Sequence, residues 1–411
     1  MARVRVALAT LGCKVNLADS DDLAAQLAAV GHEVVAYGPG AQAYVVNSCT
    51  VTAEADHKCR QLVNRALRGA PDAPVYVLGC AARVQGEALE ALSPTRVHAV
   101  VSNADLLKAI GRAGERVAVA RRHTRAFIKI QEGCDARCSY CIVPAARGLP
   151  TSVASDQIIK QVEAAADAGV PEVVLTGTSI GRYGEDLSST IDLNALVRRL
   201  ATIGPRLRLS SVEPMDLGDG IVELLVEGLI CRHLHVPLQS GDDAVLKSMG
   251  RPYSGADFMA LVRRLRAASE GVAITTDVMV GFPGEDDDAF AYTERFCRLA
   301  RFARLHVFRY SPRPGTPAAE LEETVSPEVK RIRAAKLRAL GEQLAMAHVC
   351  SLVDRPVEVV VERHDAQGRS LGVSDEYARV VLPKEFPVGS LIRARGVRAT
   401  GGYLYAEPSR S

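Results

Sequence analysis

The chain has 411 residues, 48% of them hydrophobic, so it can bury a large core and form more than one domain. With 50 Lys and Arg residues against 48 Asp and Glu, the net charge is only +2, and a nucleic acid would have to bind through local basic patches. The sequence shows neither a secretory signal nor an apolar run of membrane-spanning length, so we expect a cytoplasmic protein with no membrane partner. In such a compartment the ten cysteines are expected to bind metal or catalyse rather than form disulfides.

Residues 1–120 are predicted to form an N-terminal α/β domain with a mostly parallel sheet. The runs VRVALAT, EVVAY, AYVVNSC and VYVLGC are typical of strands, and helical periodicity occupies residues 19–30 and 53–68. Strands that alternate with helices favour a parallel sheet. The basic, glycine-containing segment GRAGERVAVARRHTRAF, residues 111–127, is predicted to be a linker.

Residues 121–350 repeat the order strand then helix six times. The predicted strands lie in FIKIQEGC, EVVLTG, RLRLSSVEP, HLHVPLQSG, VAITTDVMVGF and RLHVFRYSP. Six units are too few for a closed eightfold barrel, so the simplest architecture is an open six-stranded (β/α) barrel. A long charged helix over residues 325–350 ends this block.

Residues 351–411 change character, and from about Pro356 they are predicted to form a small antiparallel β-barrel. The runs VEVVVE, ARVVL, LIRARGV and YLYAE are short, alternating strands separated by turn residues.

Three cysteines, Cys134, Cys138 and Cys141, lie within QEGCDARCSYCIVPAARG, directly after the first strand of the second block. Sites in parallel barrels are built at the carboxyl ends of strands. Three thiolates leave a coordination position of a metal cluster open, whereas four would saturate it. A structural zinc with a fourth ligand from elsewhere is the alternative, but C-x₃-C-x₂-C differs from the paired C-x₂-C motifs of zinc sites. An iron–sulfur cluster that passes an electron to S-adenosyl-L-methionine (SAM) is the favoured interpretation.

Three further cysteines each end a predicted strand of the first block: Cys13 in TLGCKVN, Cys49 in NSCTVT and Cys80 in VLGCAA. Since the carboxyl ends of parallel strands meet at one edge of a sheet, these thiols could converge on one metal. Any one of them alone would be an ordinary buried side chain. The other four cysteines lack such a position and are predicted to be core residues: Cys59, Cys231, Cys297 and Cys350.

Together with Tyr140 before its last cysteine, the C-x₃-C-x₂-C motif resembles that of the radical SAM enzymes. LGCKVN, NSCTVTAEADHKCRQ and LSSVEP resemble one family among them, the methylthiotransferases, and most closely the branch that modifies threonylcarbamoyladenosine in tRNA. The resemblance implies SAM, two 4Fe-4S clusters on the two cysteine triads, and a C-terminal TRAM-like domain that binds RNA. One departure is Ala145 after Pro144, where the family commonly has an aromatic residue, although Arg147 and Gly148 fit.

The implied reaction adds a methylthio group to carbon 2 of threonylcarbamoyladenosine next to the anticodon. Alternatives are isopentenyladenosine in tRNA, an aspartate of a ribosomal protein, or an iron–sulfur protein that binds RNA without catalysis. The expected partners are the tRNA anticodon arm, an external electron donor and a sulfur source. Basic residues that could follow RNA phosphates lie in one predicted helix, although such runs are usually solvated: Lys58, Arg60, Arg65 and Arg68.

Polar or small residues at other strand ends of the barrel are predicted to contact SAM or substrate, while no catalytic residue is assigned. A polar side chain in an otherwise apolar strand needs a partner, and a glycine allows close approach to the backbone. The predicted cofactor-binding residues are Tyr140, Gly177, Glu213, Gln239 and Asp277.

Overall fold

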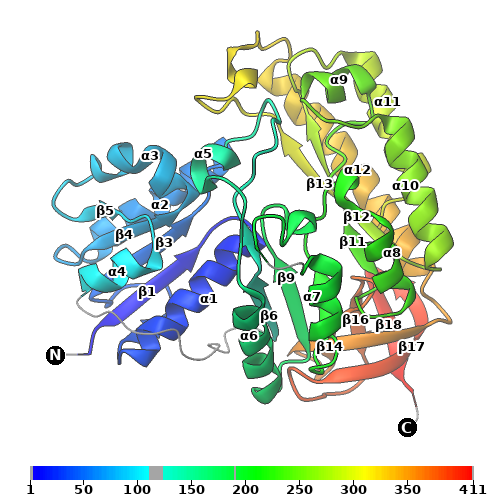
Figure 1. The fold of residues 1–411 in the computed structure, drawn as a ribbon, viewed down its shortest axis with the longest axis horizontal. Coiled ribbons are helices and arrows are strands. Elements are labelled where there is room, and N and C mark those ends of the chain that lie inside the picture. Colours follow the sequence, from blue (N-terminus) through cyan, green and yellow to red (C-terminus); the bar gives the residue numbers. More distant parts are fainter. Residues whose placement is uncertain (1–2, 111–123, 189–190, 410–411) are drawn as a thin grey trace.

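The computed structural model describes residues 3–110, 124–188 and 191–409. In chain order it contains an N-terminal α/β domain, a barrel of parallel strands and a small closed β-barrel (Figure 1). Most of the predicted linker, residues 111–123, lies outside the described residues. No helix within the described ranges is long and apolar enough to cross a membrane.

The N-terminal domain is a parallel five-stranded sheet in the order β2-β1-β3-β4-β5, as predicted. Its strands are β1 (Arg5–Thr10), β2 (Glu33–Val35), β3 (Ala43–Ser48), β4 (Val75–Gly79) and β5 (Val97–Ala99). Its helices are α1 (Lys14–Ala29), α2 (Ala53–Gly69), α3 (Cys80–Glu90) and α4 (Asn103–Ile110). Apolar residues of α1 and α4 cover one face of the sheet and those of α2 and α3 the other. Sequence periodicity missed the three-residue strand β5.

The three N-terminal cysteines follow neighbouring strands of this sheet. Cys13 comes after β1, Cys49 after β3 and Cys80 after β4, and β1, β3 and β4 are adjacent in the strand order. Strand order reverses direction at β1, and in open α/β sheets ligands bind beyond the carboxyl ends of strands at such a switch point. The topology therefore brings three distant cysteines to one edge.

The second unit is an open six-stranded barrel, which confirms the predicted architecture. Its strands are β6 (Arg125–Lys129), β9 (Glu172–Thr176), β10 (Arg206–Leu209), β11 (His233–His235), β12 (Ala273–Val280) and β13 (Arg304–Arg309). They form two parallel three-stranded sheets, β6-β9-β10 and β11-β12-β13, which one bridge between Ser211 and His235 connects. Among the described residues, no pairing between β6 and β13 closes the ring.

Helices cover the outside of this barrel, and a short antiparallel pair lies at its first loop. The pair is β7 (Gln131–Glu132) with β8 (Thr151–Ser152). The helices are α5 (Val143–Arg147), α6 (Ser155–Asp167), α7 (Leu193–Leu200), α8 (Asp219–Val226), α9 (Asp243–Ser248), α10 (Gly255–Ala268), α11 (Asp287–Ala300) and α12 (Pro327–Cys350). Three 3₁₀ turns span Ile180–Arg182, Pro214–Asp216 and Pro317–Glu320. The boundaries follow local chemistry: α10, for example, begins after Ser254, which forms a reciprocal capping box with Asp257.

The C-terminal unit is a closed five-stranded barrel in the order β14-β15-β16-β18-β17. Its strands are β14 (Pro356–His364), β15 (Ser370–Ser374), β16 (Arg379–Leu382), β17 (Leu391–Thr400) and β18 (Tyr403–Pro408). Four of the five pairings are antiparallel, as predicted, and the parallel pair β16–β18 closes the barrel. The polar strand β15 was not predicted. A Cβ at Gly372 within it would lie 2.1 Å from the Val360 carbonyl oxygen, so close strand approach requires a glycine there.

Buried arginines attach the C-terminal barrel to the amino ends of the large barrel's strands. Arg208, which has no exposed surface, donates to the Ser374 and Asp375 carbonyl oxygens, each at 3.0 Å, and pairs with Glu172 at 2.8 Å. Arg206 donates to the Glu358 carbonyl oxygen at 2.7 Å. Removing one partner of a buried ion pair typically costs about 3–5 kcal/mol because the other charge is left unpaired, so the loss of Arg208 or Glu172 would destabilise this junction.

Candidate functional site

One cavity of about 1690 Å³ joins the three units. All six cysteines of the two predicted triads line it, and so do the five predicted cofactor-binding residues. Pockets for a single drug-sized ligand usually measure about 300–1,000 Å³. The cavity therefore has room for more than one ligand between the triads.

The N-terminal triad converges because its loops pack tightly. Gly12 has φ 108°, and a Cβ there would lie 2.6 Å from the Cys49 Cβ, so only glycine lets the Cys13 loop approach Cys49. Cys13 is exposed to the cavity, whereas Cys49 and Cys80 are buried. Burial, with smaller contributions from the nearby Cys80 and Cys13, raises the pKa of the Cys49 thiol to about 11. A metal bound here must therefore displace a proton.

The barrel triad is fixed by its own loop. The Ser139 amide donates to the Met249 carbonyl oxygen at 3.0 Å, and the Ser139 hydroxyl donates to the Ser248 carbonyl oxygen at 2.8 Å. Gly133, with φ 81°, lies where a Cβ would be 2.0 Å from the Leu149 carbonyl oxygen. These contacts hold the loop that carries Cys134, Cys138 and Cys141 over the end of the barrel, where burial raises the pKa of Cys141 to about 12.

The spacing of the sulfurs argues against a single zinc ion in either triad. In the described part of the chain, neither cysteine triad brings all three sulfurs within 4.8 Å of one another. A tetrahedral zinc with Zn–S bonds near 2.3 Å would hold its sulfur ligands about 3.8 Å apart. Wider spacing, an open cavity and three thiols per site fit iron–sulfur clusters that keep one iron accessible.

Each triad has its own buried arginine, which contacts one of the three cysteines. Beside the barrel triad, Arg251 donates to the Cys138 sulfur at 3.2 Å, to the Tyr253 hydroxyl at 2.9 Å and to Glu213 in a close ion pair. Only 8% of Arg251 is exposed. Glu213, predicted to bind cofactor, thus orients an arginine that stabilises negative charge on the Cys138 sulfur.

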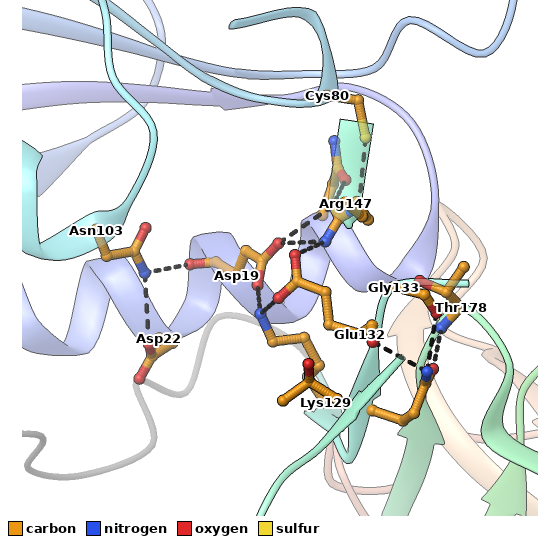
Figure 2. Close-up of polar contacts among 12 residues, drawn as sticks. Asp19, Asp22, Cys80, Asn103, Lys129, Glu132, Gly133, Arg147 and Thr178 are labelled. Carbon is orange, nitrogen blue, oxygen red and sulfur yellow. Dashed lines mark hydrogen bonds and ion pairs between the residues drawn. The ribbon is translucent and has the colours of Figure 1, made fainter. Parts of the chain in front are cut away.

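Arg147 plays the corresponding part at the N-terminal triad, although it belongs to α5 of the barrel. Figure 2 shows it between Cys80, Asp19 and Glu132. Its Nε lies 3.3 Å from the Cys80 sulfur, and its Nη1 lies 2.8 Å from Glu132 and 3.3 Å from Asp19. Lys129 pairs with the same two carboxylates. Burial alone would raise the pKa of Glu132, but the charges of Lys129 and Arg147 lower it.

Several buried polar atoms that line the cavity have no partner. Among the described residues, atoms of this kind include Thr178 Oγ1, Ser210 Oγ, Asp216 Oδ2 and His233 Nδ1. Buried polar atoms in proteins are nearly always hydrogen-bonded, so these atoms are equipped to bind a polar ligand. The amino, carboxylate and ribose hydroxyl groups of SAM fit this donor and acceptor set.

Family models match two parts of the chain: the radical SAM superfamily over residues 128–297 and a family described as uncharacterized protein family UPF0004 over residues 5–102. A threonylcarbamoyladenosine tRNA methylthiotransferase of Bacillus subtilis is 36% identical across 98% of this chain and 95% of its own length. The chain belongs to the radical SAM methylthiotransferase family. This methylthiotransferase is therefore a transferase that uses SAM and 4Fe-4S clusters.

Other similar proteins are also named as enzymes that add a methylthio group to tRNA, although the modified base differs among them. A Thermotoga maritima protein with the same function name is 32% identical over 91% of this chain and 90% of its own length. A tRNA-2-methylthio-N(6)-dimethylallyladenosine synthase of Frankia casuarinae is 33% identical over 89% of this chain and 72% of its own length. The solved radical SAM methyltransferase TsrM of Kitasatospora setae has a TM-score of 0.51 over 77% of each chain; at 16% identity it supports the fold alone.

Three further residues predicted to bind cofactor, Gly177, Gln239 and Tyr140, line the cavity of this methylthiotransferase. Each of them also has a structural role that the sequence did not indicate. A Cβ at Gly177 would lie 2.7 Å from the Gln131 carbonyl oxygen, so chain packing requires this glycine whether or not a ligand approaches. Gln239 has φ 69° and pairs through its backbone with Asp277 and Met279. Tyr140 packs edge-on against Phe282 at 6.4 Å. Their contacts with SAM or substrate stay predictions.

Asp277 belongs to a group that sequence reasoning missed. Its Oδ1 lies 3.2 Å from His235 Nε2 and 3.3 Å from His306 Nδ1, and Thr275 Oγ1 contacts His235 Nδ1 at 2.9 Å. The three ligand atoms lie within 4.8 Å of one another. Burial alone would raise the pKa of Asp277, but the hydrogen bonds and charges of both histidines lower it. His235 and His306 occupy strands next to Asp277, a pattern that could have indicated them.

Proposed function

We propose that this methylthiotransferase adds a methylthio group to carbon 2 of threonylcarbamoyladenosine next to the anticodon of tRNA. The observation that carries the proposal is that both cysteine triads open onto one cavity, so a C–H bond broken beside one triad can meet sulfur held at the other. The relatives named for threonylcarbamoyladenosine, at 36% and 32% identity over 98% and 91% of this chain, support this base as the substrate.

Each triad offers three cysteine thiols, the donor groups that hold a 4Fe-4S cluster with one iron left open. Cys134, Cys138 and Cys141 would hold the cluster that binds SAM, and Cys13, Cys49 and Cys80 would hold the second. When bound, the clusters and SAM supply the one-electron chemistry that a non-acidic C–H bond requires.

The chain's own side chains position these groups. Arg251 donates to Cys138 and Arg147 donates to Cys80, so each triad has a fixed positive charge beside it. Arg147 comes from the barrel and also contacts Asp19 of α1, so it ties the two triads into one arrangement. The reacting base would therefore enter a site in which these charged side chains are already positioned.

The tRNA must present a single base to the cavity, which requires unstacking in a loop. The TRAM-like C-terminal barrel and the exposed cations Lys58, Arg65 and Arg68 of α2 are suited to hold the anticodon arm, and Lys58 also lines the cavity. An external electron donor, a sulfur source and a cytoplasmic location remain part of the proposal.

The test uses purified protein with both clusters reconstituted, SAM, reductant and sulfide. It is incubated separately with anticodon stem–loops that carry threonylcarbamoyladenosine or dimethylallyladenosine, and with the ribosomal-protein substrate. Mass spectrometry of the digests should show a methylthio group on threonylcarbamoyladenosine. An unchanged threonylcarbamoyladenosine beside a modified dimethylallyladenosine or aspartate would overturn the assignment.

A further inference from the structure

Three units of the chain meet at the cavity around the ring of Tyr377. This tyrosine belongs to the C-terminal barrel, Lys14 begins α1, and His233 begins β11. The Lys14 Nζ lies 5.9 Å from the Tyr377 ring centroid, and the His233 ring stacks on Tyr377 at 4.3 Å. All three residues line the cavity that contains the cysteines. We call Lys14, His233 and Tyr377 the basic subsite.

The ammonium group of Lys14 forms no hydrogen bond or ion pair with any other residue in the described ranges; its one recorded contact is with the Tyr377 ring. The charged groups that act on it are Arg208, Arg125, Glu172 and Asp277. Lys14 is half-buried, and a lysine partly withdrawn from water is normally paired with an acid, because an isolated charge is costly to bury. Lys14 therefore has capacity for an anion.

Neither neighbouring acid is available to Lys14. Glu172 contacts Arg208 at 2.8 Å, Arg206 at 2.9 Å and Arg125 at 3.7 Å, so three arginines already compensate its charge. Asp277 is held between two histidines. Both acids are thus occupied by other cations, which leaves the Lys14 ammonium group without an anionic partner among the described residues, so a ligand carboxylate could supply one.

The subsite, and the cavity lining beyond it, also offer neutral hydrogen-bonding atoms. His233 Nε2 lies 3.0 Å from Thr275 Oγ1, while its Nδ1 is buried without a partner. Ser210 Oγ is likewise unpartnered and lines the cavity. A ligand group that fits would combine a carboxylate with a hydroxyl or carbonyl.

We propose that the basic subsite binds the threonyl carboxylate of the substrate's N6 substituent, with Lys14 as the residue that selects it. This inference rests on the proposed function and names the atoms behind its substrate preference. A threonylcarbamoyl group carries a carboxylate, a hydroxyl and a carbonyl, whereas a dimethylallyl group is hydrocarbon alone. A hydrocarbon placed here would leave the ammonium group unpaired and desolvated, which is how a polar site rejects an apolar analogue.

The test compares two anticodon stem–loops that differ only at this carboxylate: one carries threonylcarbamoyladenosine and the other its carboxyl methyl ester. Dissociation constants are measured by fluorescence anisotropy with the reconstituted protein, and methylthio product is measured by mass spectrometry. The wild type should bind the acid between about tenfold and about a hundredfold more tightly than the ester, the range expected for a hydrogen bond to a charged group.

Three variants separate Lys14 from general effects. Lys14→Met should reduce the ratio of the two dissociation constants to near one, and Lys14→Arg should restore most of it. Lys160→Met is the matched control, because Lys160 is exposed on α6 outside the cavity, and it should leave the ratio unchanged. Iron content and 5′-deoxyadenosine formed without RNA show whether a Lys14 variant still carries its clusters.

The outcomes distinguish the subsite from the proposed function. Equal affinity of the wild type for acid and ester would overturn the subsite whatever the variants do, and so would an unchanged ratio in an iron-loaded Lys14→Met. Methylthio product without discrimination would leave the proposed function standing and the subsite wrong. Tighter binding of the acid than of the ester, with no methylthio product, would support the subsite and contradict the proposed function.

Discussion

The two cysteine triads reach the same cavity by different routes. The barrel triad lies within eight consecutive residues of one loop, and its arginine, Arg251, belongs to the same barrel. The N-terminal triad is assembled from the ends of three strands, and its arginine, Arg147, comes from the other domain. The barrel triad therefore has its arginine within its own domain, whereas the N-terminal triad gains its arginine only when the two domains are docked.

The largest expected effect comes from removing the barrel triad. Changing Cys134, Cys138 and Cys141 to Ala should lower the iron content of the anaerobically reconstituted protein from about eight atoms to about four, one cluster on each triad. Both 5′-deoxyadenosine and methylthio product should disappear, because SAM would bind at the lost cluster. Iron analysis and chromatography of the products check this, and iron that falls to zero would refute independent triads.

A smaller effect is expected from the arginine that joins the domains. Arg147→Gln would leave Asp19 with Lys129 alone and Glu132 with Lys129 and the more distant Arg83, and loss of one partner from a buried charge network costs about 3–5 kcal/mol. Methylthio product should therefore fall more than 5′-deoxyadenosine, and the temperature of thermal unfolding should drop.

The matched control is Arg198→Gln, since Arg198 of α7 forms exposed pairs with Glu223 of α8 and with Glu227, which directly follows α8. Surface pairs of this kind contribute about 0–1 kcal/mol, so both products should stay near wild type. If Arg147→Gln lowered the two products equally, dependence of the N-terminal triad on docking would be wrong.

Much of the fold, and the position of both triads at strand ends, could be predicted because the signals are local. Alternating strands and helices fix which edge of a parallel sheet the cysteines occupy, and Cys13, Cys49 and Cys80 each directly follow a strand. The short strands β5 and β15 were missed because three residues, or a polar run that contains glycine, carry little periodicity.

The residues that complete the site could not be predicted because their partners are distant in sequence. Arg147 lies 67 residues from Cys80, and Arg251 lies 113 residues from Cys138, so no spacing rule connects them. Tyr377 was expected only within an RNA-binding domain, yet it lines the cavity. Nothing in the run TLGCKVN indicates that Lys14 reaches this ring, since that contact depends on how three units dock.

The central claim is that the two triads share one cavity and have separate roles. The most direct test changes Cys13, Cys49 and Cys80 to Ala and measures 5′-deoxyadenosine and methylthio nucleoside in the same reaction with threonylcarbamoyladenosine tRNA. The variant should retain about four iron atoms on the barrel triad. It should also still cleave SAM to 5′-deoxyadenosine and form no methylthio product. Loss of 5′-deoxyadenosine from a folded variant with those iron atoms, or methylthio product at the wild-type level, would contradict the account.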